Sequence, residues 1–148
     1  MIVIGTLLGI AFRSQEGGRM YETDGTLIDK ARGIDRKENG NPDRRVTLLS
    51  QEKWGDACRE LGVELSWTVR RANLYIAEIP LGPEMVGKRI RIGSEVVLQV
   101  ALETKPCDVM DETCTGLKDA LTPDWRGGVS CRVIEGGAVF VGDEVGIE

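Results

Sequence analysis

Short apolar segments separated by glycine are the feature that most limits the folds open to this chain. Nineteen glycines occur among its 148 residues, and between many of them apolar and polar side chains alternate. Alternation over a short run is typical of half-buried β-strands, and segments 96–103 and 129–134 are the clearest cases. Many short strands and few helices predict a mainly β fold, a small closed or partly closed β-barrel with two or more short helices.

Two segments have helical periodicity instead. Ser50 is a suitable N-cap for a helix that ends at Gly62. A second helical face, closed by Pro123, contains Met110, Cys114, Leu117 and Leu121. These patterns predict one helix over 51–61 and another over about 110–121.

Turn signals organise the rest of the chain. Asp24-Gly25 and Glu135-Gly136-Gly137 each predict a β-hairpin. A polar stretch at about residues 13–44 predicts a long loop, and Gly5 and Gly9 indicate a crowded first strand. The segments 86–92 and 141–147 resemble each other, each with a tight turn before a strand.

Length and charge restrict the class of protein. A chain of 148 residues predicts a single domain over residues 1–148, and a net charge of −5 argues against nucleic-acid binding. The apolar opening, residues 1–12, is shorter than a membrane span and has no basic residue before it. We therefore expect a cytoplasmic protein without a membrane segment.

The chain contains no histidine. This excludes Ser-His-Asp and Cys-His nucleophile activation, imidazole proton transfer and histidine-ligated metals. Chemistry in this protein must use cysteine, carboxylates, lysine, arginine or backbone groups.

Cys107 differs from the other three cysteines in its position. It follows Lys105-Pro106 at the end of the strand over 96–103, where a side chain can be held rigidly and exposed. Lys105 and a helix start would favour its thiolate, whereas Asp108 and Asp111 would oppose it. The alternative is that Cys107 is a small buried apolar side chain, as we expect for Cys58, Cys114 and Cys131.

Basic residues recur in several segments that a barrel could bring together. Convergent arginines would suit an anionic cofactor, while separate arginines would form solvated faces. Gly127-Gly128 beside Arg126 could bring backbone N–H groups close to an anion, and Asn73 could cap a turn or bind a ligand. The clustered residues are Arg44, Arg45, Arg70, Arg71, Lys88, Arg89, Arg91, Arg126 and Arg132.

From about Gly33 onward the sequence resembles the MOSC domain, the C-terminal module of molybdenum cofactor sulfurases, and its length is closest to the stand-alone bacterial members. The resemblance lies in the order and spacing of several segments, of which the lysine-proline-cysteine corner and the closing VGD sequence match best. The segments are GNPDRRVTLLS, RRANLYIAEIPL, VGKRIRIGS, VLQVALETKPC, RGGVSCRVIEGG and VFVGDEV.

The resemblance implies a mainly β barrel in which Cys107 carries sulfur as a persulfide or ligates molybdenum. Arg44 or Arg45, together with Arg71, would bind the pterin of the molybdenum cofactor (molybdopterin), and Asn73 occupies the Asn-Leu position. We add Lys105 and Arg126, which lie beside Cys107 and the paired glycines, to the predicted cofactor-binding residues.

Two departures from the family pattern stand out. Many members have a histidine near residues 33–43, and this chain has none. The residues around the Asn-Leu position also differ, at Ala72 and at 77–80. Both departures fall in segments that the resemblance assigns to the cofactor site.

Three functions follow from these observations, and the sequence leaves open whether the protein is an enzyme. The first is a MOSC protein that binds molybdenum cofactor or carries sulfur on Cys107. A partner cysteine desulfurase would supply the sulfur, because no segment resembles a pyridoxal-phosphate domain, and a metal or cofactor would receive it. The second is a non-catalytic barrel that binds an anionic ligand or a partner protein. The third is a molybdenum-dependent reductase component for N-hydroxylated substrates, which would need an electron-transfer partner or a molybdoenzyme.

Overall fold

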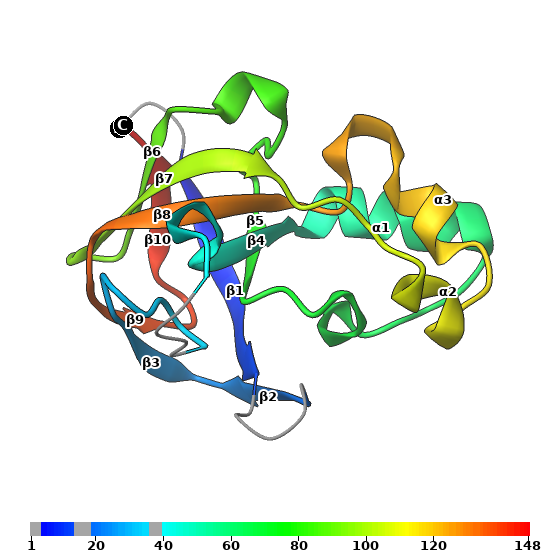
Figure 1. Cartoon of the computed structure of the whole chain (residues 1–148), viewed down its shortest axis with the longest axis horizontal. Coiled ribbons are helices and arrows are strands. Elements are labelled where there is room, and N and C mark those ends of the chain that lie inside the picture. The colour runs from blue at the N-terminus through cyan, green and yellow to red at the C-terminus, as the bar shows by residue number, and fades with distance from the viewer. Residues whose placement is uncertain (1–3, 14–18, 36–39) are drawn as a thin grey trace.

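A computed structural model describes residues 4–13, 19–35 and 40–148, and in it seven strands close into a β-barrel (Figure 1). The strand order is β10-β6-β7-β8-β4-β5-β1, and pairing of β1 with β10 completes the circuit. Only β4 and β5 run parallel among these neighbours. The barrel predicted from the sequence is therefore confirmed. Its strands are β1 (Ile4–Arg13), β4 (Val46–Ser50), β5 (Leu74–Ala77), β6 (Arg89–Ile92), β7 (Val96–Glu103), β8 (Val129–Glu135) and β10 (Glu144–Ile147).

Aliphatic side chains fill the barrel, as is usual for barrels of this size. Leu7, Leu48, Leu74 and Leu98 are fully buried members of one apolar cluster. The two segments of similar sequence form neighbouring strands: β6 and β10 pair antiparallel, with Val145 opposite Ile92. Closure thus buries the apolar side chains of the two strands in one core, whereas Val86 and Val141 in the turns before them are exposed.

Gly5 and Gly9 let β1 approach its neighbours closely. A Cβ atom on Gly5 would lie 2.1 Å from the carbonyl oxygen of Ala77, and one on Gly9 would lie 2.8 Å from the Trp67 ring. The crowding predicted for this strand is confirmed.

Two long connections carry the helices, which gather at one end of the barrel (Figure 1). The first joins the parallel strands β4 and β5, and contains α1 (Gln51–Leu61) and the 3-10 turn η2 (Trp67–Arg70). The second joins β7 to β8, and contains α2 (Val109–Thr113), α3 (Leu117–Leu121) and η4 (Pro123–Trp125). The connections pack together through α1 against α3 and α2 against η2. Their contact buries a second apolar cluster that includes Trp54 and Trp67.

The first helix has the predicted ends. The hydroxyl of Ser50 accepts a hydrogen bond from the Lys53 N–H at 3.2 Å, and Gly62 ends the helix with φ 66°. The prediction of one helix over 110–121 was wrong. Gly116 adopts φ 89°, a left-handed conformation that separates α2 from α3.

Both predicted hairpins were wrong, because the strands at each turn pair with other partners. β2 (Met20–Thr23) pairs with β1, whereas β3 (Gly25–Ile28) pairs with β9 (Gly137–Phe140). The described parts of the predicted loop thus contain two strands, and β3–β9 forms a separate ribbon. Segments 14–18 and 36–39 of that loop, and residues 1–3, lie outside the described residues.

Two 3-10 turns complete the list of elements: η1 (Pro42–Arg44) and η3 (Pro83–Met85). No helix in the described part of the chain is long and apolar enough to cross a membrane.

Candidate functional site

Cys107 lies where the two helical connections meet. It is exposed, four residues after the end of β7, and its carbonyl oxygen accepts a hydrogen bond from the Met110 N–H at 3.0 Å. The neighbouring Asp108 binds the Lys118 ammonium at 2.6 Å, which lowers the pKa of that carboxyl. The loop is thus anchored into α2 and across to α3, while the thiol stays open to solvent.

Arg70 holds this loop through hydrogen bonds from its buried side chain. Its side chain is buried, with 7% of the residue exposed. The Nε–H group donates to the Gly127 carbonyl at 2.9 Å, and an Nη2–H group donates to the Thr104 carbonyl at 2.8 Å. One guanidinium therefore joins the start of the Cys107 loop to the glycine pair before β8.

Close packing around the Cys107 loop requires a glycine at position 127. A Cβ atom on Gly127 would lie 2.6 Å from the Thr104 carbonyl oxygen, and 3.2 Å from both Arg70 Nη2 and Pro106 Cδ. Thr104 is also held from its side chain, by a 2.6 Å hydrogen bond between its hydroxyl and that of Ser130. The chain before Cys107 is thus fixed by β8 on one side and by Arg70 on the other.

A pocket of about 400 Å³ opens beside this loop. Val69 and Arg71 form one side of it and Val109 and Met110 the other, with Met20, Thr68 and Thr113 completing the lining. Arg71 has φ 68° at the end of η2, and its N–H donates to the Thr68 carbonyl. The pocket combines a cationic side chain with apolar walls, and Val109 is only two residues from Cys107.

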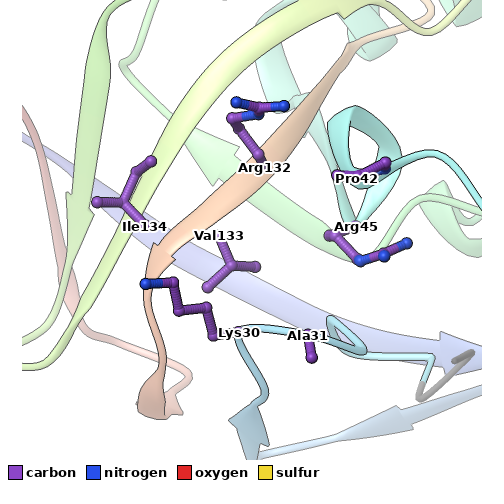
Figure 2. Close-up of a pocket in the computed structure, with 7 residues that line it drawn as sticks. All are labelled: Lys30, Ala31, Pro42, Arg45, Arg132, Val133 and Ile134. Carbon is purple, nitrogen blue, oxygen red and sulfur yellow. The ribbon is translucent and has the colours of Figure 1, made fainter.

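Arg44 and Arg45 lie at the end of η1, and neither lines the pocket beside the Cys107 loop. Arg44 is exposed on η1, while Arg45 lines a pocket of about 710 Å³ with Lys30, Arg132 and four other residues. Figure 2 shows that the Arg45 and Arg132 side chains point in different directions, away from Lys30. Arg45 donates to the carbonyls of Gly40 and Asn41, and Arg132 pairs with Asp43 at 2.8 Å. The side chains of Lys30, Arg45 and Arg132 therefore do not converge on a single anion site.

Asn73 and Arg126 have structural partners. Asn73 is 2% exposed, and its amide makes four hydrogen bonds with Thr47, Ala11 and Asp35. Arg126 donates to the Ala120 carbonyl and pairs with Glu60 at 2.8 Å, which raises the pKa of the guanidinium. Lys105 is exposed beside Cys107. Of the six predicted cofactor-binding residues, Lys105 lies on the Cys107 loop, Arg126 precedes the Gly127 that packs against that loop, and Arg71 lines the neighbouring pocket. A cofactor role for all six stays a prediction.

Sequence reasoning did not select Arg70 for the site. The sequence shows only an Arg70-Arg71 pair, and both side chains look equally available. The left-handed residue at Arg71 turns the chain into β5, which sends Arg70 inward and Arg71 to the pocket. No pattern in the sequence indicates that turn.

The four thiols differ strongly in accessibility. Cys131 is fully buried in the barrel, and burial raises the pKa of its thiol as it does that of Cys58. Cys114 is half-buried between α2 and α3. We expect native protein to alkylate first at Cys107, and Cys58 and Cys131 to react at least about 100-fold more slowly, because buried neutral thiols are poor nucleophiles. Mass spectrometry of iodoacetamide-labelled peptides over time measures this order, and equal labelling of Cys131 and Cys107 would contradict it.

No group of three or more cysteine, aspartate or glutamate side chains forms a metal site in the parts of the chain described. Cys107 is therefore not one of such a group of side chains in those parts of the chain.

Comparison with known proteins agrees with this architecture. The MOSC domain matches residues 35–146, whereas no curated protein matches the chain. The YuaD protein from Bacillus subtilis has a TM-score of 0.80 at 20% identity, over 97% of this chain and 95% of that one. YiiM from Geobacillus stearothermophilus has a TM-score of 0.76 at 14% identity, over 97% of this chain and 75% of that one. YiiM from Escherichia coli has a TM-score of 0.72 at 14% identity, over 100% and 70% of the two chains. These likenesses show a shared fold, and because the domain match spans most of the sequence, the chain belongs to the MOSC domain family.

Proposed function

We propose that Cys107 accepts a sulfur atom as a persulfide and passes it to a metal or cofactor. One observation carries the proposal: among four free cysteines, only Cys107 is exposed, and its loop is anchored on both sides. A reactive thiol must be accessible and held in place, and Cys107 meets both conditions.

The transfer step uses the Cys107 thiolate as nucleophile. It attacks the terminal sulfur of a persulfide on a partner cysteine desulfurase, so an S–S bond forms at Cys107 and the donor's S–S bond breaks. The donor cysteine leaves as a thiolate, and no external oxidant or reductant is needed.

Molybdenum cofactor is the acceptor or ligand that the family membership suggests. Cys107 would provide a sulfur ligand, and Arg71 in the neighbouring pocket would bind an anionic part of the pterin, since guanidinium groups suit phosphate. The cofactor would supply redox chemistry or a sulfur acceptor. The protein residues would hold it beside the thiol.

Sulfur loading of the purified chain tests this function. After incubation with a cysteine desulfurase and cysteine, we expect about one sulfane sulfur per chain by cyanolysis, if one accessible thiolate is the acceptor. Cys107→Ser should lose it, whereas Cys114→Ser, at the half-buried thiol, should keep it. Equal loading of Cys107→Ser and the unmodified chain would disprove the assignment, and no loading of either would favour a non-catalytic binding module.

Molybdenum content is a separate measurement. Protein purified from molybdate-replete cells should contain the metal, and Cys107→Ser should lose most of it. Metal retained in Cys107→Ser would show that the thiolate is not a ligand.

A further inference from the structure

Arg70 is a buried cation without a carboxylate partner among the described residues. Its hydrogen-bond acceptors are two backbone carbonyls, Gly127 and Thr104. By contrast Arg126, which precedes the same glycine pair, has Glu60 as counter-ion. A buried charge is normally paired because leaving water is costly, so the isolated guanidinium requires an explanation.

The environment of Arg70 points toward Cys107. Burial lowers the pKa of the guanidinium, and the charge interaction that opposes this effect is with Cys107. Arg70 Nη2 and Pro106 Cδ both approach within 3.2 Å of the Cβ position of Gly127, which places the guanidinium beside the residue preceding Cys107. The guanidinium of Arg70 therefore lies close enough to the thiol for a charge on Cys107 to interact with it.

Rigidity makes this charge effective. Two hydrogen bonds to backbone carbonyls fix the guanidinium, and the residue is buried. A fixed charge at a partly dry site interacts more strongly with an anion than a mobile surface charge does. Lys105 is closer to Cys107 in sequence but is exposed, so water and salt screen it.

We propose that Arg70 is a positioning residue that compensates negative charge at Cys107, and that it gives the site a preference for reaction partners carrying their own negative charge. The proposal rests on the proposed role of Cys107 as the reacting thiol, and it adds the charge class of the partner. A thiolate attacking an anionic sulfur donor brings two negative charges together. Arg70 would offset their repulsion.

Two alkylating reagents of similar shape test this preference on the full chain. Iodoacetate is anionic and iodoacetamide is neutral, and both transfer a carbon to the thiolate with loss of iodide. The ratio of their rate constants at Cys107, followed by peptide mass spectrometry at one pH and ionic strength, cancels the fraction of thiolate. We expect the ratio to be roughly fivefold higher in the folded chain than in urea-unfolded chain, as for a cation a few ångströms away.

Matched variants separate charge from packing. Arg70→Met should lower the ratio about fivefold, whereas Arg70→Lys, which keeps the charge, should stay within about twofold of the unmodified chain. Lys88→Met, at an exposed cation just before β6, should also stay within about twofold, because water and salt screen its charge. Circular dichroism identifies any variant that does not fold. If Arg70→Met does not fold, the test is the unmodified chain alone: its iodoacetate-to-iodoacetamide rate ratio at Cys107 is compared between the folded and the urea-unfolded state.

The outcomes distinguish this inference from the proposed function. A folded Arg70→Met with an unchanged ratio, or an unmodified chain whose ratio does not change on unfolding, would overturn the inference and leave Cys107 as the sulfur acceptor. A Cys107 that reacts with neither reagent in the folded chain would instead remove the proposed function.

Discussion

Gly128→Ala is expected to lower the free energy of unfolding by about 4 kcal/mol, near the upper end for a single substitution. Gly128 has φ 102°, which an alanine adopts only with strain. A Cβ atom there would lie 2.2 Å from the Leu48 carbonyl oxygen, so β4 or β8 would have to move. Urea denaturation followed by circular dichroism measures the loss.

Gly142 is the matched control for this prediction. Its φ of 98° is nearly the same, but a Cβ atom there would meet nothing within 4 Å. Gly142→Ala should therefore cost only the backbone strain, roughly 1–2 kcal/mol. If both variants lose the same stability, close packing at Gly128 is not the cause.

Local patterns predicted the elements whose causes are local. The helix from Ser50 to Gly62 was predicted because both of its capping interactions depend on nearby residues. The strand over 96–103 was predicted because apolar and polar side chains alternate along most of it, although Val97 on the second face is buried as well. The closed barrel was also predicted, from the many short strands and glycine turns along the chain rather than from any particular strand pair.

Strand partners depend on distant residues, and there the sequence was insufficient. Glu135-Gly136-Gly137 suits a tight turn, yet β9 pairs with β3 from the other end of the chain. Gly116 divides the predicted second helix through a backbone conformation that no apolar spacing reveals. Turn residues indicate that the chain changes direction but do not identify its next neighbour.

In the candidate site, too, features set by nearby residues could be predicted better than features set by distant contacts. The sequence singled out Cys107 by its place between a strand end and a helix start but left it either exposed or buried, and the structure has it exposed. The arrangement of the basic residues could not be predicted, since Arg45, Arg71 and Arg126 come from separate segments whose contacts depend on the closed barrel. The contacts of Arg70 with Thr104 and Gly127 likewise depend on long-range packing.

Asn73→Ala is expected to lower the free energy of unfolding by about 3 kcal/mol, because it leaves several buried groups without partners. The Asn73 amide joins three parts of the fold. Its oxygen accepts from the N–H and hydroxyl of Thr47, and its nitrogen donates to the Ala11 carbonyl and the Asp35 carboxylate. Thermal or urea unfolding measures the effect.

Thr47→Val is a milder test of the same network. It removes the hydroxyl that bonds with Asn73 and leaves the other three hydrogen bonds of the amide, so about 1 kcal/mol should be lost. The stability and the molybdenum content of Asn73→Ala together separate a cofactor role for Asn73 from a structural one. If Asn73→Ala is as stable as the unmodified chain but has lost its molybdenum, the amide serves the cofactor. A large loss of stability with metal content retained would instead show that Asn73 serves the fold, by joining β1, β4 and the Asp35 segment.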